Sequence, residues 1–131
     1  MTYAIWMVGS TVGPDLHIHS TASDGLLAPE EIVAQAVRRG IRMISLTDHD
    51  TVAGVLPAMR AAEGTNLVVV PGVEISSETG GRQVHVLGYW VDPEDPTLLA
   101  RLAVQQQARR SRAERIVAIL QEHGLEKVLL S

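Results

Sequence analysis

Apolar runs alternate with helix-forming segments along most of the chain. β-prone or continuously apolar runs occupy residues 16–20, 41–47 and 66–76, and an unbroken apolar run is typical of a strand buried on both faces of a sheet. Helices are predicted between these runs, at 29–39 and 51–63. The order strand–helix–strand–helix–strand predicts an α/β fold with a parallel sheet or barrel.

The helix boundaries carry residues with known positional preferences. Pro29 suits the first helical position, and the two glutamates that follow it suit the positive end of the helix dipole. Gly40 closes this helix. Thr51 is predicted to cap the second helix, which Gly64 ends.

A fourth strand and a long helix are predicted farther along the chain. Gly80 and Gly81 indicate a turn into a strand at 82–91, and a helical pattern then runs from 97 to 123. We divide the chain into a leader or extra edge strand (1–14), an α/β core (15–96) and a helical segment that packs on the core (97–131).

Composition narrows the class of protein. The 131 residues suffice for one domain, and an apolar fraction of 46% with 20% charged residues is typical of a soluble globular protein. With no Cys, a metal site would need His, Asp, Glu, backbone or water. The net charge of −4 argues against a broad surface for nucleic acid or anionic membrane. No apolar run approaches the roughly 18 residues of a membrane span, so we expect a cytoplasmic protein without a membrane partner.

Two of the five histidines lie two positions apart, in Asp15-Leu-His-Ile-His. Alternate residues of a strand share a face, so Asp15, His17 and His19 point the same way. The two imidazoles, about 6–7 Å apart at their Cα atoms, are able to converge on one metal ion. The alternative is a pair of surface or core histidines that hydrogen-bond to the backbone.

Further acidic and imidazole side chains follow the other predicted strands. Asp24 comes after the first strand, His49 directly after the second, Glu74 near the end of the third apolar run, and His85 lies within the fourth strand. The ends of successive strands of a parallel barrel meet on one rim. These residues are therefore predicted to form a multinuclear site for hard or borderline metals.

Four stretches carry a family resemblance, in this order: DLHIHSTASDG, LTDHDT, VPGVEIS and VHVLGY. They resemble the successive motifs of the polymerase and histidinol phosphatase (PHP) superfamily, and most closely its small stand-alone phosphoesterases acting on nucleotides and short oligonucleotides. The resemblance extends from Asp15 to Gly124 and implies a TIM-like barrel of the seven-stranded PHP type.

The resemblance also implies a role for each motif residue. It implies two or three Mn, Fe or Zn ions: His17 and His19 match ligands of the first, Asp24 and His49 ligands of the second, Glu74 the bridging carboxylate, and His85 a ligand of the third. Asp15 and Asp48 are interpreted as residues that orient imidazoles by hydrogen bonding. Asp50 is interpreted as a helix cap together with Thr51, and Ser20 and Ser23 as turn residues.

Arginines cluster in the long helical segment. Arg109, Arg112 and Arg115 are spaced to lie on roughly one side of a helix. They are either a solvated face paired with Glu114 and Glu122 or a phosphate-binding group. The resemblance favours substrate phosphate contacts for Arg109 and Arg112. His123, beside Gly124, is interpreted as a helix-end histidine rather than a ligand.

The match to the family is partial. A full barrel of this kind has about 250 residues, and only about four of its seven strands are traced here. The family's later ligands, a histidine beyond the helical segment and an Asp-x-His, have no counterpart after His85. We therefore expect about half a barrel followed by a long helix, and self-association through exposed sheet edges.

The function implied by the resemblance is that of a metal-dependent phosphoesterase. It would hydrolyse phosphate monoesters, nucleotides or 5′-phosphorylated oligonucleotides through a metal-bound hydroxide. One alternative is a truncated or degenerate, non-catalytic metal-binding module, completed by oligomerisation or by a partner. A polymerase-associated domain is less favoured because no polymerase sequence accompanies the motifs.

Overall fold

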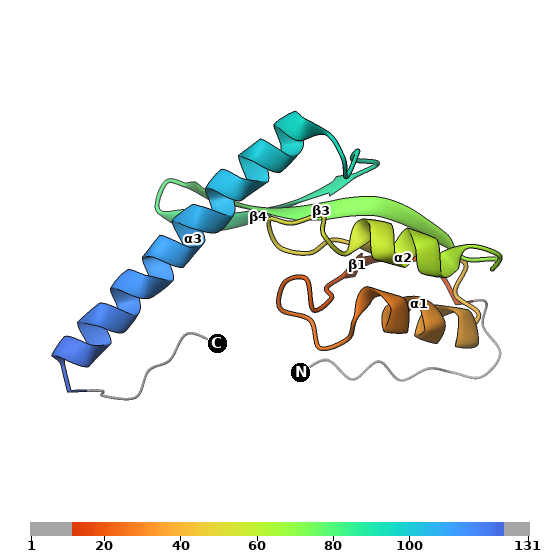
Figure 1. Cartoon of the computed structure of the whole chain (residues 1–131), viewed down its shortest axis with the longest axis horizontal. Coiled ribbons are helices and arrows are strands. Elements are labelled where there is room, and N and C mark those ends of the chain that lie inside the picture. Colours follow the sequence, from red (N-terminus) through yellow and green to blue (C-terminus); the bar gives the residue numbers. More distant parts are fainter. Residues whose placement is uncertain (1–11, 125–131) are drawn as a thin grey trace.

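The computed structural model describes residues 12–124, so most of the predicted leader and the end of the helical segment lie outside the described residues. Within this part, four strands form one sheet in the order β1-β2-β3-β4 (Figure 1). The elements in chain order are β1 (Asp15–Ile18), α1 (Pro29–Arg38), β2 (Met43–Leu46), α2 (Val55–Ala62), β3 (Val68–Thr79), β4 (Arg82–Tyr89) and α3 (Pro96–Glu122).

The sheet combines a parallel part with one hairpin. β1, β2 and β3 pair in parallel, whereas β3 and β4 pair antiparallel over the full length of β4, from Gly72 opposite Tyr89 to Thr79 opposite Arg82. Gly80 and Gly81 form the turn with φ of 56° and 75°. A two-residue turn that matches the strand twist needs positive φ at both positions, which glycine adopts without strain. The predicted strands and turn are confirmed.

Helix α1 begins where its sequence predicts. Pro29 is the first helical residue, and the carboxylate of Glu31 accepts a hydrogen bond of 3.0 Å from the backbone nitrogen of Ala28. Gly40, with φ of 71°, follows the end of the helix. These contacts satisfy groups that a helix end otherwise leaves unpaired.

Helix α2 is shorter than predicted, because it begins at Val55 rather than after Thr51. The Thr51 hydroxyl accepts a bond of 3.2 Å from the nitrogen of Ala53, inside the preceding loop. The cap prediction is therefore wrong. The segment before Val55 is bound to β3 instead, since the nitrogen of Asp50 donates to the carbonyl of Glu74 at 2.8 Å.

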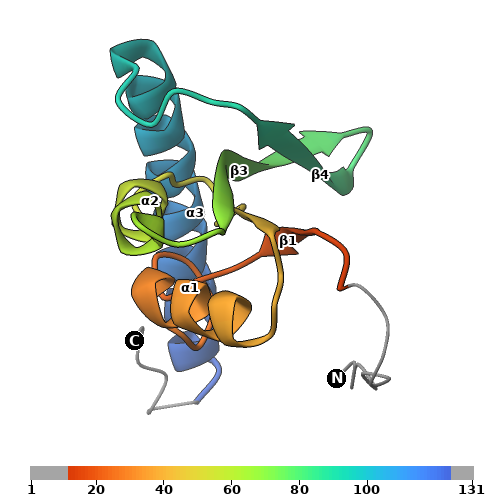
Figure 2. The same ribbon diagram turned by 90° about the vertical axis from the view of Figure 1, so that its right-hand side faces the viewer.

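Two apolar clusters form the core. The larger lies between the sheet and the helices α1 and α2, which Figure 2 shows on one side of the strands. It includes Ile44 and Leu46 of β2, both essentially fully buried. The smaller cluster joins Leu102 of α3 to Val73 of β3. Burying one such aliphatic side chain contributes about 1.5–3 kcal/mol.

Helix α3 begins at Pro96, and the carboxylate of Asp95 caps it by accepting a bond of 2.7 Å from the nitrogen of Leu98. Figure 1 shows the helix crossing the hairpin and extending beyond the sheet. Ile116 and Ile119 of this helix are about half exposed. None of the described helices has the length and apolar character needed to cross a membrane.

Candidate metal centre

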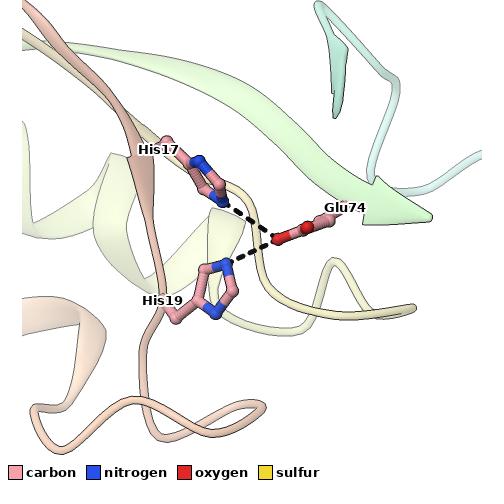
Figure 3. A group of neighbouring side chains, drawn as sticks. All are labelled: His17, His19 and Glu74. Atoms are coloured by element: carbon pink, nitrogen blue, oxygen red, sulfur yellow. Dashed lines mark hydrogen bonds and ion pairs between the residues drawn. The ribbon is translucent and has the colours of Figure 1, made fainter. Parts of the chain in front are cut away.

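The two histidines of the first motif converge on one carboxylate. His17 lies in β1 and His19 just beyond it, and their two-residue spacing puts both rings on one face. Their Nε2 atoms lie 3.0 and 2.7 Å from Oε2 of Glu74. Figure 3 shows both rings pointing toward this carboxylate. The predicted common face of this pair is confirmed.

Asp24 and His49 join the same group from two loops. Asp24 follows β1 and places Oδ1 2.7 Å from Nδ1 of His19. His49 follows β2, where it forms an isolated parallel bridge with Glu74, and its Nε2 lies 3.6 Å from Oδ2 of Asp24. The rings of His19 and His49 meet edge to face with centroids 4.5 Å apart.

Glu74 connects these residues to the hairpin. Its side chain is about 6% exposed, and Oε1 lies 2.9 Å from Nδ1 of His85 on β4. The other oxygen, Oε2, faces His17 and His19. The two oxygens of one buried carboxylate thus face different imidazoles, an arrangement suited to a group that bridges two ions.

The six side chains form three overlapping groups of three. Within each group, the ligand atoms lie within 4.8 Å of one another. The groups are His17–His19–Glu74, His19–Asp24–His49 and His49–Glu74–His85. The structure therefore brings together all six residues that the sequence predicts as ligands.

The donor set fits divalent ions. Ligands that bind one ion at about 2.0–2.2 Å lie about 3 Å apart, close to the imidazole–carboxylate distances found here. Nδ1 of His49 is buried and has no hydrogen-bond partner among the described residues. A buried polar atom without a partner is costly, and coordination of an ion would satisfy it. Imidazole and carboxylate ligands suit Zn, Fe and Mn.

The carboxylates are held in the charged form. The hydrogen bond from His19 keeps the pKa of Asp24 below its usual range, although burial opposes this effect. Burial also acts to raise the pKa of Glu74, but the hydrogen bonds of His17 and His19 and the nearby His49 lower it overall. Ionised carboxylates are the form that binds metal.

The pKa values of the two central imidazoles shift in opposite directions. Burial lowers the pKa of His19, but its hydrogen bonds to Asp24 and Glu74 outweigh burial and raise that pKa overall. Burial is the main reason that the pKa of His49 is lowered, and the charges of Glu74 and Asp24 only partly oppose it. His49 is therefore favoured in the neutral form that coordinates metals.

Asp48 was predicted to orient an imidazole, but its partners are serines. Its Oδ1 accepts bonds of 2.7 Å from the nitrogen of Ser20 and 2.6 Å from the hydroxyl of Ser23, and its Oδ2 accepts one of 2.7 Å from the hydroxyl of Ser20. Asp48 thus fixes the loop that carries Asp24 instead of orienting an imidazole. The two serines, predicted as turn residues, are the donors.

Asp15 and Asp50 also differ from their predictions. Asp15 accepts a bond of 3.4 Å from the backbone nitrogen of His17, not from its ring. Asp50 does not cap a helix: its carboxylate is buried and accepts from the nitrogen of Ser76 at 2.8 Å and from Arg109 at 3.0 Å. The resemblance favoured a contact between Arg109 and substrate phosphate, but the guanidinium is ion-paired with Asp50.

Two further contacts were not anticipated from the sequence. Gln106 of α3 donates from Nε2 to the carbonyl of Asp50 at 2.9 Å. The hydroxyl of Tyr89 donates to the carbonyl of Leu16 at 2.8 Å and so joins β4 to β1. A lone glutamine on a polar helix and a tyrosine at a strand end give no pattern from which these partners could be found.

Residues 15–131 match the family model described as PHP domain, and the chain belongs to this family. The four-stranded sheet followed by α3 is thus part of a PHP-type barrel.

Known relatives share the described region. A 5′-3′ exoribonuclease of Haemophilus influenzae is 41% identical over 111 residues, covering 85% of this chain and 40% of the relative. A 3′,5′-nucleoside bisphosphate phosphatase of Chromobacterium violaceum is 38% identical, covering 85% and 39%. A solved structure from Bifidobacterium adolescentis, described as a metal-dependent phosphoesterase, is 34% identical with a TM-score of 0.77, covering 84% and 38%. The chain spans about 40% of the length of these two curated relatives.

Proposed function

We propose that this chain holds two or three divalent metal ions and contributes them to the hydrolysis of phosphate esters. The observation that carries the proposal is the convergence of six ligand side chains, from β1, β3, β4 and two loops, in three overlapping groups. The names of the relatives, a nuclease and a phosphatase, support hydrolysis of phosphoesters as the reaction class.

The six ligand side chains are assigned to ions by their groups. His17, His19 and Glu74 would hold one ion and His49, Glu74 and His85 another, and Asp24 would serve as a ligand beside His19 and His49. When bound, such ions supply Lewis acidity, activate water and offset the charge of the phosphoryl group. No protein nucleophile is needed for this chemistry.

The substrate is proposed to be a nucleotide or a 5′-phosphorylated oligonucleotide. A cavity of about 460 Å³ lies between the β3–β4 hairpin and α3, and His85 lines it together with Arg109, Arg112 and Arg115. Guanidinium groups beside a ligand of the metal centre would bind phosphate oxygens in pairs. Arg112 is the better candidate for this contact, because Arg109 already donates to Asp50.

The native metal is proposed to be manganese, iron or zinc, because the imidazole and carboxylate ligands suit all three. A cytoplasmic location is likewise kept as a prediction from composition.

Phosphate release tests the proposed activity. Protein stripped with a chelator and reloaded with Mn²⁺ should hydrolyse a 3′,5′-bisphosphorylated nucleoside or a 5′-phosphorylated oligonucleotide. His17→Ala and Glu74→Ala should each abolish release, whereas the control His123→Ala should not, because that ring binds the carbonyl of Ile119 at the end of α3. Release that is indifferent to chelator and to both site variants would refute the proposal.

A non-catalytic metal-binding module is the second candidate. The observation that favours it is that the ligand side chains converge, whereas Arg109, expected to contact substrate, is ion-paired with Asp50. It predicts bound metal near stoichiometry but no turnover on either phosphorylated substrate. Elemental analysis of the sample used for the phosphate assay separates the two candidates.

A further inference from the structure

The loop that carries His49 is connected to α3 through its neighbour Asp50. The side chain of Asp50 is 1% exposed, and its backbone has φ of 52°. Left-handed backbone is uncommon for residues other than glycine, and where the surrounding contacts maintain it, it often marks a functional segment. The contacts of Asp50 show what maintains it here.

Four polar atoms of Asp50 are engaged. Its nitrogen donates to the carbonyl of Glu74 at 2.8 Å, and its carbonyl accepts from Nε2 of Gln106 at 2.9 Å. Oδ1 accepts from the nitrogen of Ser76 at 2.8 Å, and Oδ2 accepts from Nη1 of Arg109 at 3.0 Å. A buried carboxylate needs such partners, and the guanidinium is the cation among them.

These contacts reach both ends of one ligand group. Asp50 adjoins His49, and its partner Ser76 lies directly opposite His85 in the β3–β4 register. Glu74, the third member, bonds to the nitrogen of Asp50 through its own carbonyl. The described contacts of Asp50 include neither His17, which lies in β1, nor His19, which lies just beyond it.

We propose that Asp50 and Arg109 form a latch by which α3 positions the group His49–Glu74–His85 for metal. Arg109 is then a positioning residue and not a contact to substrate. The inference rests on the proposed function in one respect, since it takes these three side chains as ligands. It goes further by making α3 part of the scaffold of the centre.

The chain offers well-matched variants. Arg109→Met removes the charge and the donors but keeps an unbranched side chain. Asp50→Asn removes the charge yet keeps an acceptor oxygen and a residue type that tolerates left-handed backbone. Arg110→Met is the control: Arg110 neighbours Arg109 on α3, its side chain is 76% exposed, and it pairs with Glu114 at 3.4 Å.

Titration with Co²⁺, followed by its visible absorption, tests the latch. In Arg109→Met and Asp50→Asn we expect one Co²⁺ ion to bind about tenfold to a hundredfold more weakly and with an altered absorption spectrum. The affinities for the other ions should be unchanged. The double variant should bind this ion no more weakly than Arg109→Met alone, because both substitutions disrupt the same contact between Arg109 and Asp50. Arg110→Met should titrate like the unchanged protein. Identical titrations and spectra for Arg109→Met and Arg110→Met would overturn the latch.

A second readout needs no metal. If the unchanged protein takes up no Co²⁺, the proposed function fails, and imidazole NMR signals of the metal-free protein then decide the latch. Arg109→Met and Asp50→Asn should displace the ring signals of His49 and His85 and leave that of His17 in place. Equal displacement at His17, or no displacement at all, would count against it.

Discussion

Glu74 contacts more imidazoles than any other described residue. Its Oε2 lies within 3.0 Å of His17 and His19, and its Oε1 lies 2.9 Å from His85. The backbone of Glu74 pairs with Leu87 of β4 on one side and forms the isolated bridge with His49 on the other, and both restrict its movement. A change at this residue should therefore affect the whole centre.

Glu74→Gln tests this role. The amide keeps the size of the side chain but removes the charge and offers only one oxygen, so no bridge between ions is formed. We expect metal affinity to fall by at least about a hundredfold, more than is typical for residues that only support ligands. Competition with a chromophoric chelator measures the loss. The control Glu78→Gln, on the exposed end of the same strand, should bind as before, and equal affinities of the two variants would contradict the bridging role.

The protonation order of the histidines follows from the pKa shifts. In metal-free protein, His19 should protonate at higher pH than His49 as the solution is acidified, because His19 has carboxylate partners whereas burial disfavours the charged form of His49. The stability contributed by protonated His19 is then complete below its ordinary pKa of 6.5 and is lost as the pH rises through the raised pKa. NMR titration of the rings checks the order. Protonation of His49 first would be incompatible with this structure.

The loop between β1 and α1 shows how an element places a ligand. The nitrogens of Ser23 and Gly25 both donate to the carbonyl of Ser20, at 3.0 and 2.9 Å, and the turn brings Asp24 back to His19. A Cβ atom added at Gly25 would meet the backbone carbonyl of His19. Only glycine allows this close approach.

Gly25→Ala should therefore displace the loop. We expect a loss of about 1–3 kcal/mol in the free energy of unfolding, the usual effect of overpacking, together with weaker metal binding through Asp24. Chemical denaturation measures the first effect. Gly13→Ala is the control, since a Cβ there meets nothing within 4 Å, and an equal loss in both variants would show that the close approach is unimportant.

The sequence predicted elements whose signals are local. Pro29 and Gly40 bound α1, Gly80 and Gly81 form the hairpin turn, and alternation in β1 gave the common face of His17 and His19. The start of α2 was wrong because residues before Val55 pair with β3, a contact that no local pattern contains. The partners of Asp48 and Asp50 were missed for the same reason: they lie 25 to 59 positions away.

At the scale of the whole molecule, part of the apolar surface of residues 12–124 is exposed. In the described sheet β1 and β4 each pair on one side only, and Ile116 and Ile119 of α3 are about half exposed. A cavity of about 540 Å³, lined by Leu27 among other apolar residues, lies beside β1 and α1. Uncovered strand edges and apolar patches favour association.

Self-association of the 131-residue chain is therefore expected at about micromolar concentration. Sedimentation velocity should show dimers or larger species, and Ile116→Glu with Ile119→Glu should shift them toward monomer by charging the exposed stripe of α3. A single sharp monomer in the unchanged protein would contradict the expectation.

The central claim is that imidazoles and carboxylates from separate strands and loops hold metal ions around Glu74. Crystals soaked in Zn²⁺ and measured at the zinc absorption edge test it most directly. The account predicts anomalous peaks within about 2.0–2.2 Å of ligand atoms from His17, His19 and Glu74, and from His49 with Asp24 or His85. A well-phased map with no peak at Glu74 would contradict it.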